Sequence, residues 1–254
     1  MTITLLINQF TMPKVSGKRP SRRYRPYAKK RMRKSNYAIS GVSGRITKLN
    51  PGRGIFGFPD ELVTTLRYAD VITLTSTVGA VATNAFRMNS LFDPDSTGTG
   101  HQPYYFDQLA ALYNSYTVIK SNLKVQFSLI ANAIATAQPS GPCIVGIATD
   151  DDATLVATAS TLLEIPGSKS TFLNNALGGN NVKTLQVDYL PERDLGLSNE
   201  DDTTGAAVGS NPSQVWYGVP YITETGLASP TSVNIKVDMT FLVRFRKLKN
   251  PAGS

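Results

Sequence analysis

The chain has 254 residues, 41% of them hydrophobic, and a formal net charge of +8. That length and apolar content suffice for one large domain with a proper core. One cysteine, Cys143, and one histidine, His101, exclude an intrachain disulfide framework and any Cys/His metal spacing. No run of 18 apolar residues occurs, so no membrane insertion is predicted.

The first ten residues, MTITLLINQF, place an apolar run ahead of the basic residues. A secretory signal has the opposite order, with the charge first, so we do not expect secretion.

The charge is divided unevenly along the chain. Residues 1–53 hold fourteen basic and no acidic residues, which leaves the remainder with twelve basic and eighteen acidic ones, a net charge of −6. Eleven of the basic residues lie at positions 14–34 (KVSGKRPSRRYRPYAKKRMRK), called the basic segment below. Because this segment has no apolar face to bury, we expect it to be disordered alone. We therefore predict a basic, flexible arm and hinge at 1–57 and a folded domain at 58–254.

The natural partner of the basic segment is a polyanion. Arginine supplies planar forks for phosphate, lysine supplies mobile charges, and tyrosine supplies rings for stacking on unpaired bases. We predict binding of single-stranded nucleic acid that tolerates any sequence, with a slope of log K against log salt of at most about −8. The predicted contacts are Lys14, Lys18, Arg19, Arg22, Arg23, Tyr24, Arg25, Tyr27, Lys29, Lys30, Arg31, Arg33 and Lys34.

Other uses of the basic segment stay open. The run KKRMRK also fits a nuclear import signal made by Lys29, Lys30, Arg31, Arg33 and Lys34, and a ribosomal or chromatin tail has a similar composition. A membrane-surface role is disfavoured because the segment lacks an apolar helical face.

Next along the chain, GRGIFG at 52–57 matches G-x-G-x-x-G, but prolines flank it where a strand and a helix are required. It is interpreted as a hinge.

The body of the chain shows the two-residue period of strands. The clearest segments are 233–246 and 118–130, in which apolar and polar residues alternate. Weaker strands are expected at 62–76, 81–92, 143–149, 170–173, 182–189 and 215–223. Gly-, Pro- and Asn-rich connections at 93–100, 137–142, 174–181 and 198–213 are too irregular for helical crossovers, so the sheets should be antiparallel. Short helices are expected at 107–114, with Asp107 as N-cap, and at 157–164. The predicted fold is an all-β, eight-stranded antiparallel jelly roll with two short helices in its connections.

One block resembles a known family. FRMNSLFDPD at 86–95, GHQP at 100–103 and the FDQL run with its tyrosines at 106–116 resemble capsid proteins of circular Rep-encoding, circovirus-like single-stranded DNA viruses. The resemblance implies a coat protein, sixty copies of which form an icosahedral (T=1) shell around a single-stranded DNA genome. It also implies localisation in the virion and, during assembly, in the host nucleus, with a host import receptor and a cell-surface receptor as further partners. Similar blocks occur in coat proteins of small RNA viruses, so an RNA genome stays open, as does a cellular single-strand-binding protein.

The block is also explained by folding alone, as a turn-rich connection that leads into a capped helix. His101 is interpreted as a hydrogen-bonded loop residue. No Cys–His pair with a third group and no G-x-S-x-G elbow is present, so no enzyme activity and no cofactor is predicted.

Two acidic runs remain. Asp150, Asp151 and Asp152 are weak candidates for a Ca²⁺ site at a subunit contact, although a solvated turn is preferred. Glu200, Asp201 and Asp202 are interpreted as decoration of an outer loop.

Overall fold

The computed structural model describes residues 58–76, 80–129, 142–155, 158–174, 182–224 and 232–250. The chain divides into two units, Met1–Arg45 and Ile46–Ser254, and all described residues belong to the second. The basic segment and the GRGIFG hinge therefore lie outside the described residues, and the boundary predicted at residue 57 stays a prediction. Among the described helices, none is long and apolar enough to cross a membrane.

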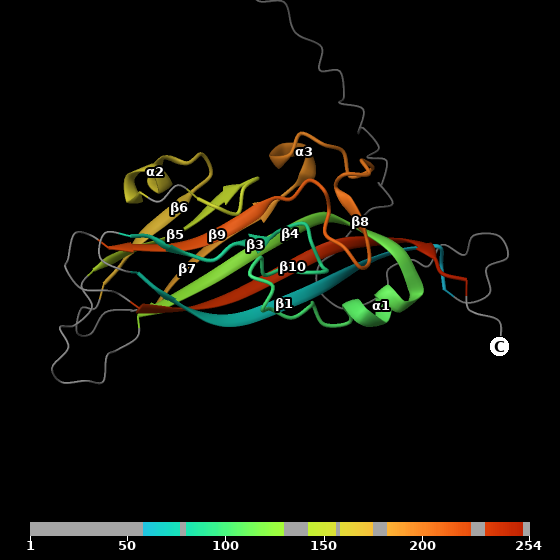
Figure 1. Ribbon diagram of the computed structural model, residues 1–254, viewed down its shortest axis with the longest axis horizontal. Helices are drawn as coiled ribbons and strands as arrows, with labels where there is room; N and C mark the ends of the chain where they lie inside the picture. The colour runs from blue at the N-terminus through green and yellow to red at the C-terminus, as the bar shows by residue number, and fades with distance from the viewer. Residues whose placement is uncertain are drawn as a thin grey trace, which may run out of the picture. The chain divides into compact units, whose positions relative to one another are not determined.

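Sheet A has the strand order β1 (Glu61–Thr75), β10 (Ser232–Leu248), β4 (Tyr113–Leu129) and β7 (Val182–Tyr189). A short strand, β8 (Gly205–Ala207), pairs with the first residues of β4. All of these pairs are antiparallel, and the β1–β10 register runs without a break from Glu61 opposite Arg246 to Thr75 opposite Ser232. The long β1, β10 and β4 ribbons lie side by side in Figure 1.

Sheet B has the order β2 (Ala82–Thr83), β9 (Tyr217–Glu224), β5 (Cys143–Asp150) and β6 (Lys169–Leu173), and β3 (Phe86–Arg87) also pairs with β9. Because β2 and β3 pair with the same strand, they occupy one position, and the described strands other than β8 then fill eight positions in the two sheets. The chain moves between the sheets at nearly every connection, which makes two interlocked Greek keys. The predicted antiparallel jelly roll is confirmed, with β8 as an addition.

The core lies between the two sheets. The alternation predicted at 233–246 is confirmed, because its seven apolar positions on one face are all fully buried: Val233, Ile235, Val237, Met239, Phe241, Val243 and Phe245. Leu123, Val125 and Phe127 of β4 join the same cluster, and sheet B contributes Cys143, Val145 and Ile147. At roughly 25 cal/mol per Å² of buried apolar surface, this double layer is the main stabilising term of the fold.

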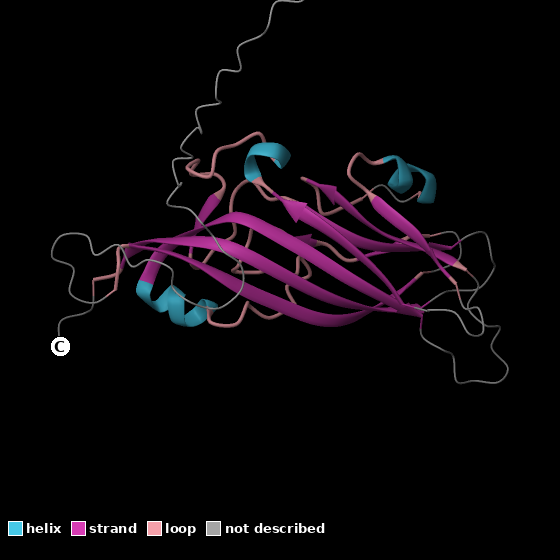
Figure 2. Ribbon diagram, turned by 180° about the vertical axis from the view of Figure 1, so that it is seen from behind, coloured by secondary structure: helices cyan, strands magenta, loops and turns pink. Residues whose placement is uncertain are grey.

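Within the described residues three short helices join the strands, one more than predicted. Figures 1 and 2 show α2 (Ala159–Glu164) and α3 (Pro191–Asp194) at one side of the two sheets and α1 (Phe106–Leu112) at the other. Helix α2 covers a second, small apolar cluster made by Ala148, Leu162 and Tyr221. Helix α3 was missed because four residues are too few to show a helical period.

The prediction for α1 was wrong in two respects. Asp107 is not the N-cap but a residue of the first turn; the N-cap is Tyr105, which has a left-handed backbone (φ 71°) and no side-chain capping bond. The helix also ends earlier, because Tyr113 and Asn114 already belong to β4. Burial of the Tyr113 ring in the core outweighs the helical spacing on which the prediction relied.

The expected strand at 81–92 is broken. Only four of its residues are in β2 and β3. Between and after them the backbone bonds to β9 and to the residue before it: Asn84 N–H donates to Pro220 O (3.2 Å) and Met88 N–H to Trp216 O (2.8 Å). The loop expected at 198–213 contains β8, whose Gly-Ala-Ala sequence carries no alternation. Residue 130, the expected end of the second strand, lies outside the described residues.

Candidate nucleic-acid interface

The thirteen residues predicted to contact nucleic acid all precede residue 58 and lie outside the described residues. The five import residues are among them. Their roles therefore stay predictions, and the described domain can add only cationic surfaces of its own.

Basic side chains of the domain gather on the face of sheet A that points away from the core. Strand β10 places Lys236, Arg244 and Arg246 on this face, at positions that alternate with its buried residues. Along the middle of the sheet one carboxylate bridges two cations: Asp238 Oδ1 lies 2.7 Å from Arg67 Nη2, and Asp238 Oδ2 lies 3.2 Å from Lys236 Nζ. Part of the positive charge in the middle of this face is therefore neutralised.

A different arrangement occurs at the end of sheet A where β1 begins and β10 ends. Arg244 Nη1 donates to one carboxylate oxygen of Glu200, and Arg246 Nη2 donates to the other. Glu200 comes from the loop between α3 and β8, and its side chain is 61% exposed, whereas Arg244 and Arg246 are 20% and 30% exposed. The hydrogen bond from Arg244, followed by the one from Arg246, lowers the pKa of Glu200. This trio is called the Arg244–Arg246–Glu200 cluster below.

The interpretation of Glu200, Asp201 and Asp202 as loop decoration is corrected for the first two. Glu200 bridges two arginines of β10, and Asp201 accepts the backbone N–H of Thr203 (2.8 Å) within its own turn. The hydroxyl of Thr203 also donates to Asp201, and this bond, together with the backbone bond, lowers the pKa of Asp201. The alternation of β10 did reveal that Arg244 and Arg246 face outward. No sequence signal linked them to a glutamate 44 and 46 positions away.

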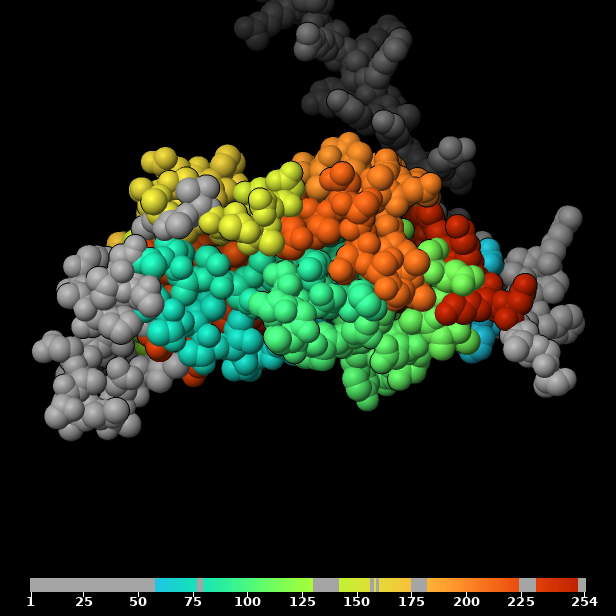
Figure 3. Space-filling model, viewed as in Figure 1, coloured from blue at the N-terminus to red at the C-terminus, as the bar shows by residue number. Residues whose placement is uncertain are grey.

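The block that carries the family resemblance forms a hydrogen-bonded scaffold at the surface shown in Figure 3, where its green atoms cross the middle of the view. Arg87 Nη1 donates to Asp93 Oδ2 (2.7 Å) and to Asp93 O (2.9 Å). The buried Asp95 accepts the backbone N–H of Thr97 (3.0 Å), which closes the turn after the Asp-Pro-Asp run.

The next residues of the block bond to segments far along the chain. Asn89 Nδ2 donates to Gln214 O (2.7 Å), and Asn89 Oδ1 accepts Trp216 N–H (3.1 Å). The hydroxyls of Ser90 and Tyr116 lie 3.1 Å apart, and both are buried. These bonds hold the 86–95 loop against β4 and the start of β9, which supports the interpretation that the block stabilises the fold.

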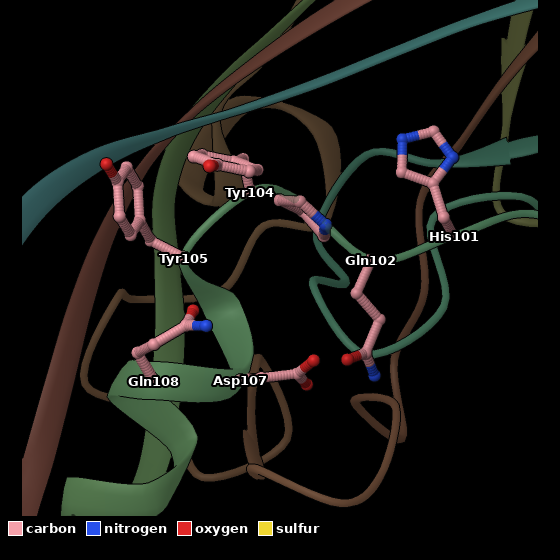
Figure 4. A pocket seen from close by; sticks show the side chains of 7 residues that line it. His101, Gln102, Tyr104, Tyr105, Asp107 and Gln108 are labelled. Carbon is pink, nitrogen blue, oxygen red and sulfur yellow. The ribbon is translucent and has the colours of Figure 1, made fainter.

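A pocket with a volume of about 360 Å³ lies beside α1. Figure 4 shows the exposed rings of Tyr104 and Tyr105 there, together with His101, Gln102, Asp107 and Gln108. The two tyrosine rings meet edge to face with centroids 4.5 Å apart. His101, expected to be a hydrogen-bonded residue, stacks on the ring of Tyr68 with a centroid distance of 4.6 Å.

The aspartates proposed as weak metal ligands bond to their own turn. Asp150 Oδ1 accepts Asp151 N–H (2.8 Å), and Asp152 Oδ1 accepts Thr154 N–H (2.9 Å). Among the residues that the structure describes, no group of three or more His, Cys, Asp or Glu could hold a metal ion.

No protein-family profile matches the sequence, and no curated protein matches it. Solved structures of low similarity do. Desmodium yellow mottle tymovirus shares 16% identity over 82% of this chain and 99% of its own, with a TM-score of 0.39. The 60-mer BFDV capsid protein shares 14% over 78% and 100%, with a TM-score of 0.39. Turnip Yellow Mosaic Virus shares 13% over 76% and 98%, with a TM-score of 0.42. The jelly-roll assignment stands on the strand order described above.

Proposed function

We propose that this chain is a viral capsid protein, whose jelly-roll domain assembles into an icosahedral shell and whose basic segment packages a single-stranded genome. The observation that carries the proposal is the joining of a jelly roll to eleven lysines and arginines within residues 14–34. The folded domain forms the shell, and the positive charge of the basic segment binds the phosphates of the genome. Each segment binds weakly alone, and many segments on one strand give avidity.

Two edge strands of the described domain expose apolar side chains of the kind found in contacts between copies. Strand β1 forms an edge of sheet A and exposes Val63 and Val71; strand β6 forms an edge of sheet B and exposes Phe172 (62%). Apolar side chains on open sheet edges favour association. These exposed side chains support a role of this chain as a self-assembling subunit.

The finer proposal is a shell of sixty copies with a single-stranded DNA genome, assembled in the host nucleus after import through KKRMRK. It is supported by the resemblance of the block at 86–118, while an RNA genome is the second candidate. In this proposal the protein acts as a container, without catalysis.

The experiment is to purify the full-length protein and determine its mass by analytical ultracentrifugation and its form by electron microscopy. We expect a closed particle of megadalton mass that absorbs at 260 nm. After disassembly of the particle, nuclease should digest the material that absorbs. A monomer or dimer under all assembly conditions would refute the proposal. Digestion of the extracted nucleic acid with DNase or RNase identifies the genome type.

A further inference from the structure

The Arg244–Arg246–Glu200 cluster combines features that an ordinary surface ion pair lacks. Two guanidinium groups from one strand converge on a single carboxylate, and each takes one of its oxygens. The two arginines are largely covered, whereas the glutamate that joins them is mostly exposed and comes from a loop. The cations are therefore fixed by the sheet, while the anion is the exchangeable member.

The backbone under the arginines is held in place. Arg246 lies opposite Glu61 in the β1 register and opposite Ser115 of β4, and Arg244 lies opposite Val63 and Thr117. Beyond them, Leu248 N–H donates to Asp60 Oδ1 (3.2 Å) and Lys249 Nζ donates to Ala110 O (2.7 Å). A paired strand with an anchored end presents the two guanidinium groups in a preformed geometry, which lowers the entropy lost on binding an anion.

Arg244 has a donor left over. Its Nε lies 2.9 Å from Glu61 Oε1, an ion-pair distance, yet the N–H is not aimed at that oxygen and makes no hydrogen bond within the described residues. A backbone phosphodiester presents two charged oxygens, as a carboxylate does, and therefore fits the same pair of arginine donors. Arg244 Nε is buried, so the phosphate takes the Nη donors of Arg244 and Arg246 that Glu200 now occupies.

One contact of the cluster lies early in the described chain. The last basic residue before the described chain is Arg53, and Glu61, the first residue of β1, contacts Arg244. Along the chain, eight positions separate the two. Because the covalent chain links the basic residues to β1, a strand bound by them is tethered to the molecule that carries the cluster.

We propose that Arg244 and Arg246 form a second phosphate-binding site for the packaged single strand, and that Glu200 occupies this site as an internal phosphate mimic until the strand displaces it. The inference rests on the proposed function, because it takes the packaged nucleic acid as the ligand. Glu200 competes with free phosphate for the two arginines, and a strand that carries many phosphates displaces it.

The test uses the full-length chain and the oligonucleotide dT20, with binding measured over a range of salt concentrations. Glu200→Gln removes the mimic but leaves both arginines, and it lies on an exposed loop, so folding should be retained. Loss of the two arginines should make the slope of log K against log salt shallower by about 0.7, the value for one single-strand phosphate. Glu200→Gln itself should bind more tightly than the wild type, because no carboxylate competes with the strand for the arginines. The triple variant E200Q/R244Q/R246Q should lose this gain.

Asp238→Asn is the matched control. It also removes one negative charge from a carboxylate that bridges two cations on the same face of sheet A, but it leaves the cluster intact. If E200Q and D238N tighten binding equally, or if the triple variant keeps the gain, net charge explains the effect and the site is refuted. E200Q binding with wild-type affinity refutes it as well.

A further variant, in which the eleven basic residues of positions 14–34 are replaced by serine, separates the two proposals. If this variant binds dT20 as tightly as the wild type, the proposed packaging function fails. If it loses binding while E200Q shows no gain, only the inference on the cluster fails.

Discussion

The ring of Tyr221 occupies the space that a side chain at Gly146 would need. The two residues face each other in the β5–β9 register, and a Cβ at position 146 would overlap the tyrosine ring. The ring is buried on the outer side of sheet B, under α2. The glycine therefore lets an aromatic residue pack flat on the neighbouring strand, and this contact joins α2 to the sheet.

Gly146→Ala should consequently lower the free energy of unfolding by about 1–3 kcal/mol, because the added methyl group overpacks this contact. Chemical denaturation followed by tryptophan fluorescence measures the change. Gly209→Ala is the control, since no atom lies within 4 Å of its Cβ position, and a change within about 0.5 kcal/mol is expected. In a Tyr221→Ala background the cost of Gly146→Ala should shrink; an equal cost in both backgrounds would show that the ring is not its cause.

The Arg87–Asp93 ion pair should contribute more to stability than a surface pair. Its side chains are 16% and 27% exposed, and Arg87 also donates to the Asp93 carbonyl. We expect Arg87→Ala to cost about 2 kcal/mol, or roughly 4–8 °C in the melting temperature of a domain this size. Arg67→Ala breaks a pair whose arginine is 67% exposed and should cost less than about 1 kcal/mol. Equal losses in the two variants, measured by thermal melting, would contradict this ranking.

The sequence predicted the fold where one rule was enough. In β10, seven buried residues alternate with polar ones, so the period alone indicated a long strand with one covered face. At residues 81–92 the same rule failed, because the polar residues Asn89 and Ser90 are buried. Hydrogen bonds to Gln214 and Asn211 satisfy their side chains. Such partners, more than a hundred positions away, cannot be read from a local pattern. The same reason hid the contacts of Arg244 and Arg246 with Glu200.

Stability should fall at alkaline pH through buried tyrosines. Burial, followed by the Asp70 carboxylate whose Oδ2 accepts the Tyr68 hydroxyl at 3.1 Å, raises the pKa of Tyr68 above its ordinary value. Burial likewise raises the pKa of Tyr189. The folded state thus favours the neutral phenol, so this contribution is complete below pH ~10, the unfolded value, and declines as the pH rises above it.

Tyr68→Phe provides the check on this pH dependence. Its free energy of unfolding should decline less steeply between pH 9 and 11 than that of the wild type, although its absolute stability is lower because the bond to Asp70 is lost. Parallel declines in the two proteins would show that Tyr68 does not titrate as described.

Contacts between copies can be tested on the β6 edge. Phe172→Asp places a charge on an exposed apolar position of this edge strand and should slow or prevent particle formation, while circular dichroism stays that of a folded domain. Ser170→Asp, two residues away on the same strand, adds the same charge at a position that is already polar and should assemble more readily. Sedimentation velocity distinguishes the two variants. Assembly of Phe172→Asp at the wild-type rate would exclude this edge as a contact.

The most direct test of the central claim is the mass and nucleic-acid content of two full-length proteins, the wild type and the variant with serine at the eleven basic positions of 14–34. Both are purified at moderate salt and examined by sedimentation and by the ratio of absorbance at 260 and 280 nm. We predict that both self-associate and that only the wild type carries nucleic acid. A wild type that never forms particles, or a variant that retains as much nucleic acid as the wild type, would contradict the account.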